Sequence, residues 1–129
     1  MMVTPETLDA FQQMWGRFPE PVMLVHKSRT ILAVNELAKK LGIASGIKCF
    51  SRNKEEPGIT DHCRRCQADV ALRTGEAVMD KEIVEGVELF WVPLKGVPDV
   101  YLHFGIGSAE RIARLSQRSE TRQGPDAPA

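Results

Sequence analysis

The sequence predicts an α+β fold built around an antiparallel sheet, and three features lead to this class. Five short runs rich in β-branched and aromatic residues form two groups, one early and one late in the chain. Within each group only a few turn-forming residues separate the runs, which is typical of antiparallel hairpins. Segments with helical spacing of apolar residues lie before, between and after the two groups. The chain has 129 residues, the length of one ordinary domain.

The first predicted element is an amphipathic helix over the first 17 residues. Thr4 is a candidate N-cap, and Pro5 occupies the first helical position. An apolar stripe follows at helical spacing: Leu8, Phe11, Trp15 and Phe18. Such a stripe covers either the chain's own domain, as a lid, or the surface of a partner. We expect a homodimer formed through this stripe, with the lid as the alternative.

A hairpin and a short helix are predicted next. Residues 22–25 and 30–34 are two β-rich runs around a polar four-residue loop. Asn35 then acts as the N-cap of a short helix over residues 36–41, because its side chain can accept a hydrogen bond from a backbone amide of the first turn. Gly42 ends that helix.

The middle of the chain is predicted as a loop followed by a longer helix. Residues 43–61 are rich in glycine and charged residues, and Cys49 lies among them. Asp61 can cap a helix over residues 62–74, in which Cys63 and Cys66 share one face.

The last third of the chain completes the predicted sheet. After Gly75, three strands are expected, at residues 77–84, 87–94 and 100–106. Ser108 can cap a last helix through Ile112 and Leu115, and residues 118–129 form a polar tail that we expect to be disordered. The predicted organisation is therefore a helix at 1–17, a domain at 18–107 and a helix with its tail at 108–129.

The three cysteines form the main candidate site. Cys49, Cys63 and Cys66 are close in sequence and end in a Cys-Arg-Arg-Cys pair, a pattern seen in redox and metal sites. Three interpretations remain open. The thiols form a redox switch by disulfide exchange. They bind zinc together with His62 or a more distant histidine, or they hold an iron–sulfur cluster. They are inert and pack the core without any cofactor.

The composition limits the classes of partner that we expect the chain to bind. Hydrophobic residues make up 43% of the chain and charged residues 26%, both typical of a globular protein. Seventeen basic residues balance seventeen acidic ones, so the long-range attraction that nucleic acid or an anionic membrane requires is missing. We find no leader or membrane-span pattern and expect a cytoplasmic protein that binds neither nucleic acid nor membrane. No catalytic motif is present, so an enzyme is not expected.

The order of these elements, with several local motifs, resembles the PAS domains. The motifs are Asn35-Glu36-Leu37-Ala38 with Gly42, then Gly46-Ile47-Lys48-Cys49, Cys63-Arg64-Arg65-Cys66 and Thr74-Gly75-Glu76. They look like a subgroup of bacterial sensor PAS domains that carries a Gly-x-x-Cys, a Cys-x-x-Cys and a Thr-Gly-Glu in this order. The resemblance covers residues 18–107.

The resemblance implies a fold and a function. The fold would be a five-stranded antiparallel sheet with helices on one face, enclosing a pocket. Candidates for lining that pocket are Phe90, Trp91, Leu102 and Phe104. The function would be that of a sensory or regulatory domain in signal transduction that passes its response to a separate partner or through self-association. The cysteine cluster is then the expected redox- or metal-responsive input. The alternatives are a small-molecule-binding module with structural cysteines and an interaction adaptor without a ligand.

Overall fold

A computed structural model describes residues 2–49 and 65–123 of the chain. Its centre is a five-stranded antiparallel sheet with the strand order β2-β1-β5-β4-β3. The strands are β1 (Val22–His26), β2 (Ile31–Val34), β3 (Val78–Asp80), β4 (Glu88–Pro93) and β5 (Val100–Ile106). The predicted antiparallel sheet is confirmed, and β1 joins its two halves by pairing with β5 along its whole length.

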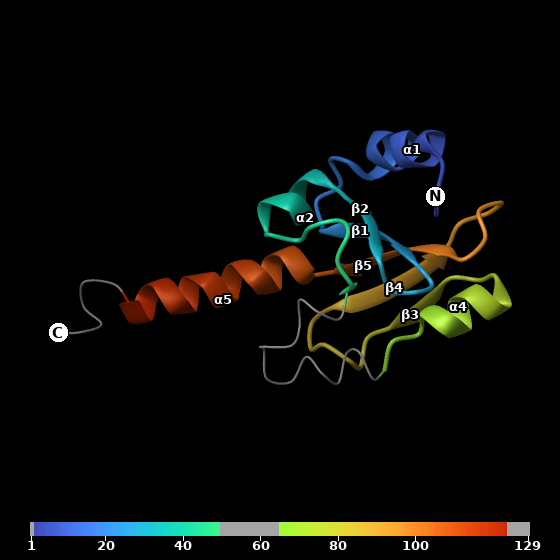
Figure 1. Ribbon diagram of the computed structural model, residues 1–129. Helices are drawn as coiled ribbons and strands as arrows, with labels where there is room; N and C mark the ends of the chain where they lie inside the picture. Colours follow the sequence, from blue (N-terminus) through green and yellow to red (C-terminus); the bar gives the residue numbers. More distant parts are fainter. Residues whose placement is uncertain (1, 50–64, 124–129) are drawn as a thin grey trace.

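The helices lie on both faces of this sheet (Figure 1). Their bounds are α1 (Pro5–Trp15), α2 (Glu36–Lys40), α4 (Ala68–Thr74) and α5 (Ser108–Gln123). Helices α2 and α4 pack on one face, whereas α1 packs on the other. Helix α5 follows β5 and extends away from the sheet. Its last residues overlap the tail expected from the sequence, and residues 124–129 lie outside the described part.

The two faces carry separate cores because side chains alternate along each strand. On β5, Tyr101 faces α4, and the neighbouring Leu102 faces α1. The same alternation holds on β4, where Trp91 is fully buried on the α4 face and Phe90 packs on the α1 face. A sheet covered on both faces explains why β1 and β5 are almost continuously apolar.

Capping residues set the helix bounds where the sequence predicts them. The Thr4 side chain accepts a hydrogen bond from the Thr7 amide at the start of α1, and the Asn35 side chain accepts one from the Ala38 amide at the start of α2. Helix α4 ends at Gly75, whose φ of 72° lies in the left-handed region that glycine adopts without a steric penalty.

Strand β3 is shorter than predicted, because a side chain starts a turn early. Asp80 accepts a hydrogen bond from the Glu82 amide at 2.7 Å, which is an Asx turn. The chain therefore leaves the sheet after Asp80, although the sequence predicts a strand through residue 84. Ile83 and Val84, which favoured a longer strand by their β propensity, pack instead against the core on the α4 face.

Candidate functional site

Two of the three cysteines, Cys49 and Cys66, lie in the described part of the chain, and both are half-buried against the core on the α4 face. They come from segments on either side of residues 50–64. Cys63 and His62 lie outside the described residues. No disulfide joins Cys49 to Cys66 in this structure.

Backbone hydrogen bonds to the β1–β2 hairpin fix the position of Cys49. The amide of Ile31 donates to the Ile47 carbonyl at 2.8 Å, and the amide of Cys49 donates to the Arg29 carbonyl at 2.8 Å. Residues 46–49 thus form an irregular extra segment along the edge of β2, with a bridge between Thr30 and Lys48. Any displacement of Cys49 would therefore pull on the hairpin.

Arg29 is the strained residue of this site. Its φ of 74° lies in the left-handed region, which costs a non-glycine residue about 1–2 kcal/mol. The tight turn holds it there, since its amide donates to the His26 carbonyl at 2.7 Å. Its side chain reaches towards α4, where the guanidinium donates to Asp69 Oδ1 at 3.2 Å. Strained residues often mark functional sites.

Cys66 lies just before α4 and not on it, which corrects the prediction that Cys63 and Cys66 share a face of one helix. Helix α4 begins at Ala68, and Gln67 at the N-cap position makes no side-chain capping bond. The helix starts where small residues begin to repeat against the sheet, at the buried Ala68 and Ala71. Packing of that face, more than local propensity, sets this start. The predicted cap, Asp61, lies outside the described residues.

The hydroxyl of Tyr101 interacts electrostatically with both Cys49 and Cys66. Burial raises the pKa of its hydroxyl, and a negative charge on Cys49 raises this pKa further, whereas Arg29 opposes the shift. Cys66 contributes in the same direction as Cys49. Tyr101 therefore stays neutral on the floor of the site.

Arg29 supplies the positive charge of the site. Burial acts to lower the pKa of its guanidinium, but the negative charges that Tyr101, Cys66 and Asp69 can carry outweigh this effect, and the net shift is upward. The sequence gives no sign of this role for Arg29, because a positive φ at arginine has no sequence signature. Tyr101 carries a weak signal as the one tyrosine of the chain.

The metal interpretation finds no complete ligand set in the part of the chain that the structure describes. Within residues 2–49 and 65–115, no three Cys, His, Asp or Glu side chains come together as metal ligands. The two described histidines make other contacts, although His103 lies on the α4 face of the sheet beside Trp91. His26 Nδ1 bonds to Ser28 in the hairpin turn at 2.9 Å, and the His103 ring stacks on Trp91 at 5.0 Å between centroids.

The four residues predicted to line a pocket do not line a common one. Trp91 faces α4, whereas Phe90, Leu102 and Phe104 pack under α1 on the opposite face. Phe90 and Phe104 are stacked at 5.1 Å. The alternation of side chains along a strand requires this split, since Phe90 and Trp91 are adjacent.

The apolar stripe of α1 covers the chain's own sheet, as in the lid alternative. Phe11 is 4% exposed, and Leu8, Trp15 and Phe18 pack against the same core. The ring of Trp15 lies 5.4 Å from that of Phe104. This stripe is therefore used within the chain, and the homodimer remains a prediction that needs another surface.

Comparisons with known proteins agree with this architecture. No protein-family model and no curated protein matches the chain. Its structure is similar to that of a sensory box sensor histidine kinase from Vibrio cholerae, with a TM-score of 0.52 and 15% identity over 78% of this chain and 87% of that chain. The chain has a PAS-like fold.

A second solved structure is similar at a lower TM-score of 0.49, with 19% identity over 77% of this chain and 95% of that chain. It is the photoactive yellow protein domain of the sensor histidine kinase Ppr from Rhodospirillum centenum.

Among the described helices of the chain, none combines the length and the apolar character needed to cross a bilayer.

Proposed function

We propose that this chain is a sensory domain in signal transduction, with the thiols of Cys49 and Cys66 as its input and helix α5 as its output. The observation that carries the proposal is the packing of both cysteines on one core, beside Tyr101 and the cation of Arg29. The likeness to a sensory box kinase supports the sensory role, and the cysteines support a redox input.

The chemistry of the input is the oxidation of two thiols to a disulfide. Formation of the S–S bond between Cys49 and Cys66 releases two protons and two electrons. Hydrogen peroxide that accepts them is reduced to two molecules of water. Attack requires a thiolate, and Arg29 is near enough to Cys66 for the two groups to interact electrostatically.

Strand β1 provides the path from the input to α5. At one end, β1 enters the hairpin turn whose Arg29 carbonyl binds the Cys49 amide. At the other end, the carboxylate of Glu20 accepts hydrogen bonds from the Gly107 and Ala109 amides at the start of α5, both at 2.8 Å. Between these points, β1 pairs with β5, which leads directly into α5. A shift of the hairpin would thus be carried to the first turn of α5.

The test joins thiol mapping to a readout of α5. The reduced full chain is treated with hydrogen peroxide, disulfides are mapped by peptide mass spectrometry, and amide exchange is measured over the first turns of α5. We expect a Cys49–Cys66 disulfide and altered exchange in α5, both lost in C66S. C63S is the matched control and should keep both.

Two results would contradict the proposal. One is a protein that keeps its thiols reduced under peroxide at concentrations that oxidise a surface thiol. The other is stoichiometric zinc in protein purified without chelator, released by C66S, which would make the cysteines metal ligands. Oxidation that leaves α5 exchange unchanged would retain the thiol chemistry and remove α5 as the output.

A further inference from the structure

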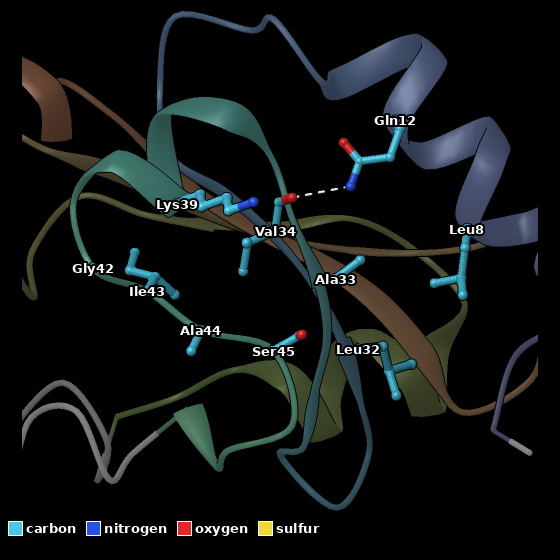
Figure 2. Close-up of a pocket in the computed structure, with 10 residues that line it drawn as sticks. All are labelled: Leu8, Gln12, Leu32, Ala33, Val34, Lys39, Gly42, Ile43, Ala44 and Ser45. Atoms are coloured by element: carbon cyan, nitrogen blue, oxygen red, sulfur yellow. Dashed lines mark hydrogen bonds between the residues drawn. The ribbon is translucent and has the colours of Figure 1, made fainter.

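A groove lies between α1, β2 and the segment that follows α2 (Figure 2). Its volume is about 600 Å³, within the range of small-ligand sites. Aliphatic side chains form most of its lining, among them Leu8, Leu32, Val34 and Ile43. One wall is tied to the edge strand, because Gln12 of α1 donates a hydrogen bond to the Val34 carbonyl at 3.0 Å.

The charge that the described lining residues give the groove is positive. Among the described residues that line it, Lys39 is the one that carries a charge. Figure 2 shows its amine directed along the groove towards Val34. Within the described part of the chain, the acidic side chains that form ion pairs do so with Arg17, Lys27 and Arg29, and none pairs with Lys39. The cation therefore faces an apolar slot without an acidic partner from the described residues.

The lining also restricts the shape of a ligand. None of the lining residues in the described part of the chain is aromatic, so they offer no stacking surface for a flat ring. Leu32 and Leu8 lie at the end away from Lys39 in Figure 2, and the hydroxyl of Ser45 points inward from the opposite wall. The arrangement is a cation at one end and aliphatic walls along the rest.

We propose that this groove binds a free, medium-chain aliphatic carboxylate. The carboxylate pairs with the Lys39 ammonium, and the alkyl chain lies along β2 past Val34 towards Leu32 and Leu8. Charge complementarity and the aliphatic lining identify this class of ligand. None of the groove residues belongs to the thiol site, so this proposal stands or falls independently of the redox input.

The experiment uses octanoate as the probe and 1-octanol as its neutral counterpart. Each probe is titrated into the 129-residue chain at concentrations below the probe's own aggregation limit, and binding is followed by amide chemical shifts. We expect saturable shifts for octanoate centred on residues 32–34 and 42–45. K39M should weaken octanoate binding roughly fivefold, the upper end for a partly exposed ion pair, and should leave octanol binding unchanged.

Two further variants separate the contribution of Lys39 from that of the neighbouring lysine and of the apolar wall. K40M removes the neighbouring lysine of α2, which does not line the groove, and should leave octanoate binding unchanged. L32S should weaken both probes, because it removes apolar wall. The proposal is overturned if K39M and K40M weaken octanoate equally, if octanoate shifts do not saturate, or if they centre on Trp91 and Tyr101 in the core of the α4 face.

Discussion

Replacing Asn35 by alanine should cost the domain roughly 4 kcal/mol of unfolding free energy. Asn35 is fully buried, and its Oδ1 accepts hydrogen bonds from the amides of Val22 and Ala38, each at 3.0 Å. Its Nδ2 donates to three carbonyls at 2.8–3.3 Å, those of Trp15, Phe18 and Glu20. This one side chain therefore joins the end of α1, the start of β1 and the start of α2.

The magnitude follows from these bonds. Loss of the cap on α2 costs about 1 kcal/mol. The Val22 amide loses its partner in a buried place, which costs about 2 kcal/mol, and the three carbonyls that accept from Nδ2 are only partly buried and together add about 1 kcal/mol. The sum is a large part of the roughly 5–15 kcal/mol of a typical domain. Urea denaturation followed by tryptophan fluorescence measures it, and the melting temperature should fall by roughly 10–20 °C.

N35D is the matched variant, because it keeps the shape and the acceptor of the cap. Its second oxygen would face three carbonyl oxygens in a buried place, so its charged form should be at least as destabilising as N35A at neutral pH. Acidification should recover part of that loss, because protonation removes the buried charge and restores one donor. A loss below about 1 kcal/mol for N35A, the cost of a cap alone, would refute this reasoning.

Three further variants test the electrostatics and the packing. Burial raises the pKa of Tyr101, so above about pH 10 the unfolded chain binds fewer protons than the folded one, and the free energy of unfolding should fall by up to about 1.4 kcal/mol per pH unit. In urea titrations at several pH values, Y101F should flatten that slope. Equal slopes for Y101F and the unchanged protein would count against the raised pKa. E20Q replaces one of the two acceptor oxygens at the start of α5 and removes the favourable negative charge there. Amide exchange in the first turn of α5 should become roughly tenfold faster, while exchange in β1 stays the same. Unchanged exchange in α5 would show that this contact does not hold the helix. In G105A the new Cβ would lie 2.5 Å from Ser108 Oγ and 2.6 Å from Val87 Cγ1. Thermal unfolding should therefore show that the free energy of unfolding falls by about 1–3 kcal/mol. An unchanged free energy would mean that these two atoms move aside freely.

Local signals in the sequence predict most of the architecture. The pairing of Thr4 with Pro5, the Asn35 cap and the stop at Gly75 each act within one turn of the backbone, and the structure contains all three. Strand β5 has the predicted bounds, because most of its residues suit a strand that is buried on both faces. The early end of β3 was missed, because it depends on whether the Asp80 side chain turns back to an amide two residues on.

The candidate site was less predictable because it depends on contacts between distant segments. The cysteines are visible in the sequence, but the partners Arg29 and Tyr101 reach them only through the hairpin and β5. The capping of α5 by Glu20 joins residues 87 positions apart, where the sequence favoured the local Ser108. Helical spacing gave the stripe of α1 correctly but could not say what it covers.

The most direct test of the account is peptide mapping of disulfides after mild peroxide treatment of the reduced protein, with amide exchange of α5 measured on the same samples. The account predicts a bond between Cys49 and Cys66, together with changed exchange in the first turn of α5, and retention of both in C63S. Thiols that stay reduced, or a disulfide that forms only through Cys63, would contradict it.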